Sequence, residues 1–258
     1  FIQPKLDGVR CLFTKDGAYS RNHKQFMNVR HIEMALKPFF DQNPDVILDG
    51  ELYNHKLKRD FEKIISLVRK QKPTDTDRLD AQHLVQFHVY DYTGQKPNLL
   101  ENLKYKGRQD NLTCSDIYCP SICYTDTKRV ATPAMIKVLH DKWLEMGYEG
   151  SIIRLNGEYE QKRSKNLLKV KDFSDSEAKI IDFVEGKGKR RGTIGKFIAV
   201  DSQGMQFGMP VMDKFKYLQD NFKEMQTWIG KIATFTYFEK TKRGSYRHPL
   251  FKAIRNYE

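Results

Sequence analysis

Charged residues two positions apart recur in the segments of this chain that read as β-strands. The pairs are Lys5 and Asp7, Asp49 and Glu51, and Lys169 and Lys171. Side chains alternate between the two faces of a strand, so the members of each pair share one face. Leu48, Leu168 and Val170 fall on the opposite face and predict a buried side. One such strand is explained by a solvated sheet face, whereas three in one region favour a polar cleft lined by sheet.

The segment 84–92 adds an aromatic residue to the polar side of this sheet. Val85, Phe87 and Val89 alternate with Gln86, His88 and Tyr90. This parity puts Tyr90 on the polar side, where its ring suits stacking on a base. The same parity returns Asp91 to the apolar side. A half-buried structural tyrosine is the alternative interpretation of Tyr90.

The first 173 residues predict a mixed α/β domain. Alternating apolar residues and turn residues predict strands over 9–14, 18–22, 46–53, 84–92, 150–154 and 167–173. Helical spacing predicts helices over 29–40, 60–70 and 133–146. Thr132 and Pro133 suit the N-cap and first position of the last helix.

The pattern changes at Ser174-Asp175-Ser176. Short strands follow over 178–185, 193–201 and 205–209, with Gly-rich turns, then one helix over 214–225 and a long strand over 231–239. This arrangement predicts a small closed β-barrel such as an OB-fold. We therefore expect an α+β chain with one domain over 1–173 and a barrel domain over 174–258.

The charge of the chain favours a polyanionic partner. Lys and Arg number 45 against 33 Asp and Glu, a formal net charge of +12. Neutralising phosphates releases counterions, so a basic protein of this kind often binds nucleic acid. A merely soluble basic protein is the alternative. No run approaches the roughly 18 apolar residues of a membrane helix, so we expect no membrane partner.

Cysteine usage indicates a reducing compartment. Cys114, Cys119 and Cys123 form a C-x4-C-x3-C pattern, and Cys11 stands apart. This is not the paired spacing of a zinc site, so ordinary thiols are the preferred interpretation. We expect a cytoplasmic, nuclear or viral location. No signal peptide is visible, but the chain opens at Phe1, which leaves an upstream targeting segment open.

Six short segments stand in an order that resembles a known family. They are KLDGVR at 5–10, SR at 20–21, LDGE at 48–51, VYD at 89–91, EGSIIR at 149–154 and LKVK at 168–171. Each is unspecific alone. Together they resemble motifs I, Ia, III, IIIa, IV and V of the covalent nucleotidyltransferases, and in particular of the small ATP-dependent DNA ligases of viruses, phages and bacteria.

The resemblance continues to the end of the chain. GKGKR at 186–190, GTIG at 192–195 and RHPLF at 247–251 resemble the OB domain of these ligases. Ile254-Arg255 resembles the start of motif VI, where Asn256-Tyr257 replace the acidic residue that usually follows. The implied fold is a nucleotidyltransferase (ATP-grasp-like adenylation) domain followed by an OB-fold domain.

The resemblance also implies roles for individual residues. Lys5 would attack the α-phosphorus of ATP, and Lys169 and Lys171 would contact the AMP phosphate as further catalytic residues. Gln3, Leu6, Arg10, Glu51, Tyr90 and Arg255 would bind the nucleotide. Within this set, Gln3 would read the adenine edge, Tyr90 would stack on the ring, and Arg10 and Glu51 would hold the ribose. Arg21 would engage the 5′-phosphate of a nick, and Glu149 would bind a catalytic metal.

The implied chemistry needs these residue types. A lysine is a poor nucleophile at its free pKa of about 10.4, and phosphoryl transfer depends on positioning and on neutralising charge at the phosphate. Two lysines and Mg²⁺ or Mn²⁺ would supply that charge. The expected cycle adenylylates Lys5 from ATP, passes AMP to the 5′-phosphate of a nick in duplex DNA, and seals the nick by attack of the 3′-hydroxyl.

Lys187, Lys189, Arg190 and Arg191 surround Gly188 and Gly192 and predict a mobile loop that binds DNA. A solvated run of charges is the alternative. We expect the chain to act as a monomer on nicked duplex DNA.

Two other classes of function stay open on the sequence. The first is an RNA ligase or an mRNA-capping guanylyltransferase. Glu149-Gly150 stands where capping enzymes usually carry Asp-Gly, which disfavours the capping activity. The second is a non-enzymatic OB-type nucleic-acid binder, which would never be labelled covalently by a nucleotide.

Overall fold

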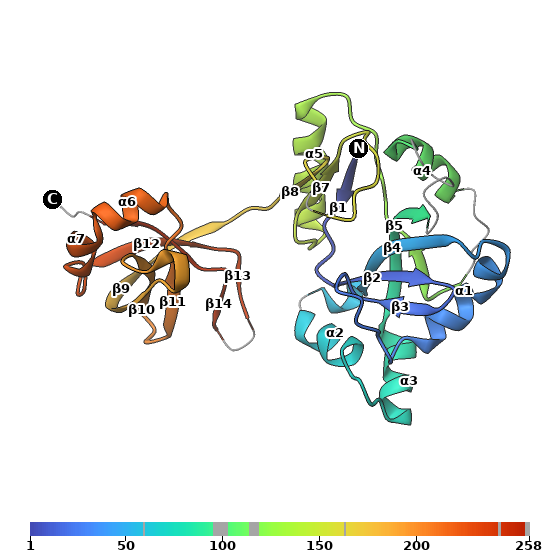
Figure 1. The fold of residues 1–258 in the computed structure, drawn as a ribbon, viewed down its shortest axis with the longest axis horizontal. Helices are drawn as coiled ribbons and strands as arrows, with labels where there is room; N and C mark the ends of the chain where they lie inside the picture. The colour runs from blue at the N-terminus through green and yellow to red at the C-terminus, as the bar shows by residue number, and fades with distance from the viewer. Residues whose placement is uncertain (59, 95–102, 114–118, 163, 242–243, 256–258) are drawn as a thin grey trace. The chain divides into compact units, whose positions relative to one another are not determined.

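The computed structural model describes the chain except for residues 59, 95–102, 114–118, 163, 242–243 and 256–258 (Figure 1). The chain divides into two compact units, Phe1–Val170 and Lys171–Glu258. We keep residue 173 as the proposed end of the first domain, because the long strand β9 begins directly after it, at Ser174. Cys114 and the predicted continuation of motif VI at 256–258 lie outside the described residues.

The larger unit contains two sheets and five described α-helices. Its strands are β1 (Ile2–Pro4), β2 (Val9–Thr14), β3 (Gly17–Tyr19), β4 (Val46–Tyr53), β5 (Gln86–Gly94), β6 (Ile122–Tyr124), β7 (Ser151–Arg154) and β8 (Leu167–Val170). Its helices are α1 (Arg30–Gln42), the short 3-10 helix η1 (His55–Leu57), α2 (Phe61–Val68), α3 (Asp75–Leu84), α4 (Tyr105–Thr113) and α5 (Pro133–Glu145).

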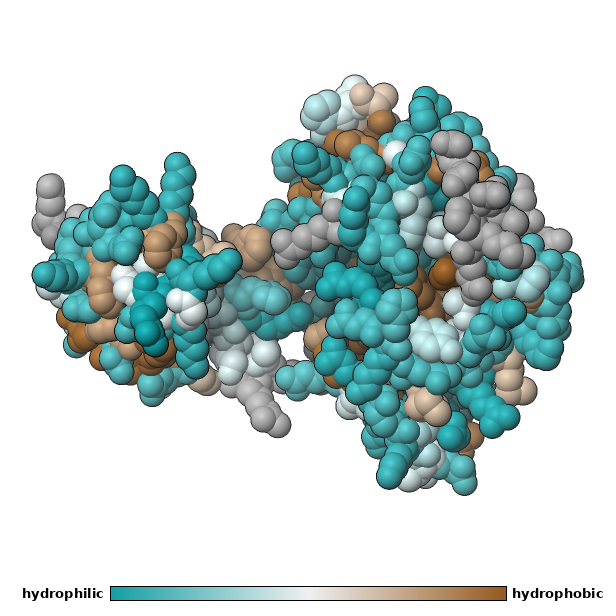
Figure 2. Space-filling model, viewed as in Figure 1, coloured by the Kyte–Doolittle hydropathy of each residue, from teal (hydrophilic) through white to brown (hydrophobic). Residues whose placement is uncertain are grey.

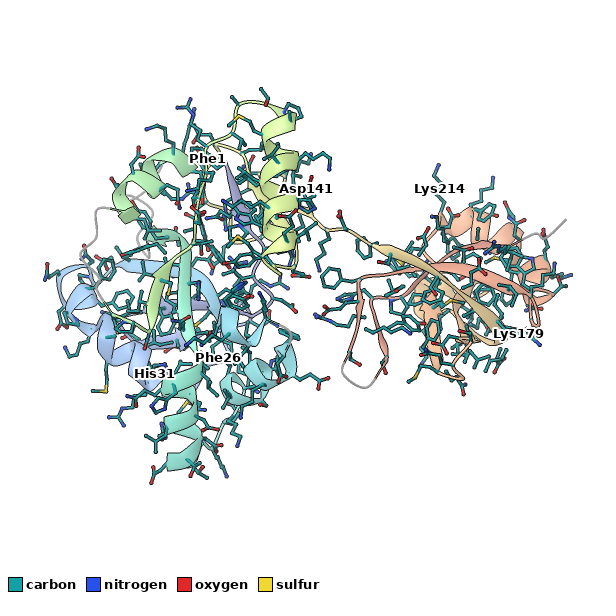
Figure 3. All side chains as sticks on the ribbon, turned by 180° about the vertical axis from the view of Figure 1, so that it is seen from behind. Phe1, Phe26, His31, Asp141, Lys179 and Lys214 are labelled. Atoms are coloured by element: carbon teal, nitrogen blue, oxygen red, sulfur yellow. The ribbon has the colours of Figure 1, made fainter. Side chains whose placement is uncertain are left out.

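The two sheets of this unit differ in their number of strands and in the helices that pack on them. The order β1-β7-β8 is antiparallel throughout, and α5 packs on β1 (Figure 1). The order β3-β2-β4-β5-β6 is antiparallel except for the parallel pair β5 and β6. The larger core lies on one face of this second sheet, where Phe13, Leu48 and Phe87 pack with residues of α1, α2 and α3. Phe26, labelled in Figure 3, is buried in the same core.

Helix caps explain where two of these helices begin. The Thr132 side chain accepts a hydrogen bond from Met135 N, and Pro133 opens α5, as predicted. Thr74 and Asp77 form a reciprocal capping box that starts α3. Helix α3 was not predicted, although its T-x-x-D signal is present in the sequence. Helix α4 was not predicted either, because its two large apolar residues, Tyr105 and Leu112, are seven positions apart in an otherwise polar segment.

The smaller unit is built on one five-stranded antiparallel sheet. Its elements are β9 (Ser174–Glu185), the 3-10 turn η3 (Gly188–Arg190), β10 (Ile194–Val200), β11 (Gln206–Pro210), α6 (Phe215–Asp220), α7 (Phe222–Gln226), β12 (Ile232–Tyr237), β13 (Glu239–Lys240), β14 (Tyr246–Arg247) and β15 (Leu250–Ile254). The sheet order is β11-β10-β9-β12-β15, and β13 pairs with β14. The predicted helix over 214–225 is two short helices that meet at Asn221.

The sheet of the smaller unit wraps around an aromatic core. Phe197 and Phe235 are fully buried in it, and the ring centroids of Phe197 and Phe251 lie 5.1 Å apart. Cα atoms of the edge strands β11 and β15 come within 8 Å of each other. Among the described residues these two edges are not joined by a strand pairing, so the hydrogen-bonded sheet stays open where a closed barrel was predicted.

The visible surface of both units is largely hydrophilic (Figure 2). In the part of the chain that the structure describes, no helix is long and apolar enough to cross a membrane. Cys11, Cys119 and Cys123 are free thiols, and Cys11 is buried.

Candidate functional site

A cavity of about 670 Å³ lies in the larger unit, with walls from both of its sheets. Strands β1, β7 and β8 contribute one wall, and β2, β4 and β5 contribute the other. Most of the predicted site residues line this cavity: Gln3, Lys5, Leu6, Arg10, Arg21, Glu51, Tyr90 and Lys169. The polar cleft that the alternating strands predicted therefore exists, and it is lined by sheet.

Strand register sets the first wall. Gln3 pairs with Ile152, and Ile152 pairs with Lys169, so these three side chains share one face of the small sheet. Lys5 follows Gln3 by two residues. Its backbone forms two hydrogen bonds with the segment that precedes β7. Lys5 N donates to Gly150 O at 2.9 Å, and Glu149 N donates to Lys5 O at 3.2 Å.

The side chain of Lys5 forms an ion pair with Glu149. The Glu149 side chain is 3% exposed and that of Lys5 is 15% exposed. Glu149 was predicted as a metal ligand. Mg²⁺ is usually held by one or two carboxylates with substrate phosphates and water completing its shell. Glu149 offers one carboxylate, which fits that donor set, although it is not among the residues that line the cavity. The described residues contain no cluster of three or more His, Cys, Asp or Glu for a metal ion.

Tyr90 lies at a β-bulge, which corrects one prediction. Asp49 pairs with Asp91 and Gly50 pairs with Val89, so Tyr90 is the extra residue. The bulge turns both Tyr90 and Asp91 toward the cavity, and both line it. Strict alternation had put Asp91 on the apolar side. That prediction was wrong because the extra residue shifts the parity by one.

A buried ionic network lies beneath Tyr90. Arg108 donates from Nε and Nη2 to the two carboxylate oxygens of Asp91 at 2.7 and 3.2 Å. Arg154 Nη1 donates to the same carboxylate at 3.1 Å. The Arg154 guanidinium also lies 4.8 Å from the centroid of the Tyr90 ring, a cation–π distance. This network fixes the ring that was predicted to stack on a base.

Gln3 is held by the same network. Arg154 Nε donates to Gln3 Oε1 at 2.8 Å, and Gln3 Nε2 donates to Thr127 Oγ1 at 2.7 Å. The residue is 2% exposed. Its amide is thus fixed in orientation, and its contact with an adenine edge stays a prediction.

Arg10 and Asp49 form a second ion pair in the cavity. Arg10 donates from Nε and Nη2 to Asp49 at 2.9 and 2.7 Å, and Tyr159 OH donates to Asp49 Oδ2 at 2.9 Å. Burial tends to lower the pKa of Arg10, but the Asp49 carboxylate outweighs it and the pKa is raised. Arg10 is therefore a fixed cation in the cavity wall.

The cavity favours an anionic ligand. Burial raises the pKa of Glu51 to about 8, against the opposing effect of Lys5 and Arg10 and with the help of Asp49 and Asp7. Partial burial first, and then the charges of Lys5, Arg21 and Arg10, lower the pKa of Lys169, against the opposing charge of Glu51. Four cations, Lys5, Arg10, Arg21 and Lys169, thus line the same cavity, and such a grouping of positive charge suits a phosphate.

The structure places the remaining predicted residues elsewhere. Leu168 is 48% exposed, so its predicted burial was wrong: β8 is the edge strand of the small sheet. Lys171 belongs to the smaller unit, where its Nζ lies 4.6 Å from the centroid of the Phe238 ring. Arg255, also in that unit, forms an ion pair with Glu177. The roles of Lys171 and Arg255 at the nucleotide stay predictions.

The cationic segment 187–191 is more ordered than expected. Gly188–Arg190 form a 3-10 turn, and Thr193 Oγ1 donates to Arg190 O at 2.7 Å. Arg190 is half-buried and its Nη2 donates to Val211 O at 3.4 Å. The prediction of an unpacked loop was therefore wrong for Arg190, whereas Lys187, Lys189 and Arg191 are exposed.

Four residues that line the cavity were not predicted as site residues: Asp91, Arg108, Arg154 and Tyr159. The sequence did contain a signal that could have identified Arg154 as a site residue, because it is the one charged residue in the short strand β7. Arg108 had none, since its helix α4 was not predicted.

Tyr90→Ala is expected to weaken nucleotide use at least tenfold, whereas Tyr90→Phe stays within about threefold of the parent. In the predicted role the ring supplies the stacking surface, and a base–aromatic stack contributes about 1–3 kcal/mol. The measurement is nucleotide affinity by calorimetry for both variants. Equal losses in the Phe and Ala variants would exclude stacking as the role of this residue.

Comparisons with known proteins agree with this geometry. A family model described as "ATP dependent DNA ligase domain" matches residues 1–171, and one described as "DNA ligase OB-like domain" matches residues 185–255. The DNA ligase of African swine fever virus (strain Badajoz 1971 Vero-adapted) is 29% identical over 216 residues, covering 75% of this chain and 46% of that protein. This chain spans about half the length of the viral relatives it matches.

Two further comparisons cover nearly the whole chain. The DNA ligase of Haemophilus influenzae is 25% identical over 258 residues, covering 97% of this chain and 84% of that protein. A solved structure from a structure–function analysis of Lig E DNA ligases has a TM-score of 0.76 at 24% identity, covering 98% of this chain and 91% of that one. The predicted fold, a nucleotidyltransferase-type domain followed by an OB-like domain, is confirmed.

Proposed function

Because the chain belongs to the ATP-dependent DNA ligase family, we propose that it joins 3′-hydroxyl and 5′-phosphate ends at nicks in duplex DNA, using ATP. The observation that carries this proposal is the placement of Lys5. Lys5 lines a cavity that Arg10, Arg21 and Lys169 also line, and its amine forms an ion pair with the buried Glu149. That is the arrangement needed to transfer a nucleotide to a lysine.

The first step would form lysyl-AMP. The Nζ of Lys5 attacks the α-phosphorus of ATP, a P–N bond forms, the bond to the bridging oxygen of the β-phosphate breaks, and pyrophosphate leaves while the amine loses a proton to solvent. Lys169 neutralises charge on the α-phosphate, and Lys171 joins it. A divalent metal at Glu149 would supply further positive charge at the phosphates.

The nucleotide would occupy the cavity in the orientation that its walls dictate. Tyr90 stacks on adenine, with Gln3 and Leu6 beside the base and Arg10 and Glu51 at the ribose. A Glu51 that is largely protonated near neutral pH, given its pKa of about 8, can donate a hydrogen bond to a ribose hydroxyl. Arg255 is a further nucleotide-binding residue in this proposal.

The later steps would use DNA. Arg21, exposed at the cavity, receives the 5′-phosphate of the nick, AMP passes to that phosphate, and the 3′-hydroxyl expels AMP. We propose that the chain acts on nicked duplex as a monomer, within the cytoplasm, nucleus or viral compartment, and uses Mg²⁺ or Mn²⁺.

A pulse–chase experiment tests this function. The protein is incubated with α-labelled ATP and Mg²⁺, freed of nucleotide, and mixed with a nicked duplex. We expect the label to move from protein to free AMP as the nick closes, and GTP to give no label. Label that stays on the protein while the duplex remains nicked would exclude the ligase activity, and no label at all would exclude nucleotidyl transfer.

Removing the three exposed cations of the 187–191 segment is expected to weaken binding to nicked DNA and to flatten its salt dependence. Each lost phosphate contact lowers the log–log salt slope by about 0.9 on duplex DNA. The variant Lys187→Ala/Lys189→Ala/Arg191→Ala spares Arg190, whose guanidinium is used within the fold. The measurement is Kd against salt concentration.

The matched control replaces three other exposed lysines of the same unit, Lys214, Lys216 and Lys223, one of which is labelled in Figure 3. Both variants lose the same net charge. An unchanged slope in the first variant, or equal slopes in the two, would show that the segment is solvated surface only.

A further inference from the structure

Glu149 lies in a loop between α5 and β7, and a metal ligand there would have to be held to within about 0.5 Å of its productive position. Residues on loops hold such positions only when the surrounding scaffold fixes them. On its C-terminal side the turn is fixed by the pairing of Lys5 with Gly150 and Glu149. Its N-terminal side begins where α5 ends, at Met146.

Two side chains from a distant part of the chain bind that helix end. Lys58 Nζ donates to Met146 O at 2.7 Å, and His55 Nε2 lies 3.1 Å from the same oxygen. The carbonyls of the last helical turn lack partners within the helix, and they form the negative end of its dipole. A cation and an imidazole N–H are suitable partners for Met146 O.

His55 connects this helix end to the strand that bears the cavity carboxylates. Because Met146 O can only accept, His55 Nε2 carries the proton, and His55 Nδ1 then accepts from Tyr53 OH at 2.9 Å. Tyr53 is fully buried at the end of β4, two residues from Glu51. Burial and the nearby Lys58 charge lower the pKa of His55, which agrees with a neutral ring.

The residues between Met146 and Glu149 pack on the same pair of side chains. The Tyr148 ring lies 4.3 Å from the His55 ring between centroids, at an angle of 31°. Gly147 adopts a φ of +87°, and a Cβ there would meet the Lys58 side chain at 2.9 Å. His55 and Lys58 therefore contact both the backbone of this turn, at Met146 and Gly147, and one of its side chains, Tyr148.

We infer that His55 and Lys58 are positioning residues for Glu149: they join the end of α5 to β4 and so couple the two sheets on either side of the cavity. This inference rests on the proposed function for the role of Glu149. Neither residue touches the cavity, so the effect passes through Met146, Gly147 and Tyr148. Groups that hydrogen-bond a metal ligand directly change metal affinity by about 10–100-fold when they are removed, and an effect passed through the turn is expected at the lower end of that range.

The test compares His55→Ala, His55→Gln and Lys58→Met with His83→Ala. His83 is an exposed histidine whose ring bonds a carbonyl of its own helix at Leu79, so it is a matched control. Mn²⁺ binding is measured in the presence of a non-reactive ATP analogue, and amide hydrogen exchange is measured over residues 146–150. Circular dichroism establishes that each variant is folded.

We expect His55→Ala and Lys58→Met to weaken Mn²⁺ binding about tenfold or more and to speed exchange of the turn, while analogue affinity at saturating Mn²⁺ changes less than about twofold. His55→Gln keeps a hydrogen-bond donor of similar reach. Its Mn²⁺ affinity and its exchange rate over residues 146–150 should therefore lie between those of the parent and of His55→Ala. If His55→Ala does not fold, Lys58→Met and His55→Gln give the answer.

Unchanged exchange and unchanged Mn²⁺ binding in the folded variants would overturn the inference, as would equal losses in His83→Ala. The proposed function is judged separately, by formation of the protein–AMP adduct in the parent. Hydrogen exchange reports on the turn whether or not that adduct forms, so the two failures are distinguishable.

Discussion

Lys5→Ala is expected to abolish the covalent protein–AMP adduct while leaving the fold intact. In the proposed mechanism the amine of Lys5 is the nucleophile, and the other lysines that line the cavity, Lys162 and Lys169, lie on different segments of the chain. Loss of a nucleophile typically costs many orders of magnitude in rate. The measurement is incorporation of label from α-labelled ATP, with the unfolding curve of each variant recorded in parallel.

Lys72→Ala is the matched control for this experiment. Lys72 is exposed, lies between α2 and α3, and does not line the cavity. It should be labelled as strongly as the parent. Normal labelling of folded Lys5→Ala would remove Lys5 from the mechanism.

Asp91→Asn is expected to destabilise the larger unit by about 3–5 kcal/mol, because it leaves buried positive charge without its counterion. The Asp91 side chain is 1% exposed and accepts from both Arg108 and Arg154. Those arginines are 3% and 11% exposed, so water cannot replace the carboxylate. The measurement is the free energy of unfolding from a denaturant titration.

An exposed ion pair provides the comparison for this variant. Lys37 and Asp41 pair at 2.8 Å on the surface of α1, with side chains 70% and 61% exposed. Surface pairs of this kind contribute little, so Asp41→Asn should leave the unfolding curve nearly unchanged. A loss below about 1 kcal/mol in Asp91→Asn would mean that the network is far more hydrated than its geometry indicates.

Strand parity allowed much of the cavity to be predicted. The predicted bounds of β4 are those of the structure, and Asp49 and Glu51 both reach the cavity from one face. Lys169 reaches it for the same reason. Alternation is a local property of an extended chain, so it is readable without knowing which strands pair.

The wrong predictions for Asp91 and Leu168 depend on how the strands pair, which the alternation of side chains along one strand does not reveal. The bulge at Tyr90 depends on the register between β4 and β5, and one extra residue reverses the side on which Asp91 lies. The exposure of Leu168 depends on β8 being an edge strand. Sheet order and register are set by contacts far apart in sequence.

The ionic network under Tyr90 also could not be predicted from the sequence. Arg108 reaches Asp91 from α4 and Arg154 reaches it from β7, so the site is assembled from three segments with unrelated local patterns. The same holds for His55 and Met146, which are 91 residues apart. Residue types suggested the chemistry of the cavity, whereas the groups that position it become visible only in the folded chain.

The proposed mechanism requires that Lys5 becomes covalently bonded to AMP. Peptide mapping by mass spectrometry tests it most directly: the parent protein is incubated with ATP and Mg²⁺, digested, and searched for a peptide that carries one adenylyl group. We predict that the group lies on Lys5 alone and that a nicked duplex removes it. An adenylyl group on another lysine, or a protein that remains unmodified while it seals nicks, would contradict the mechanism.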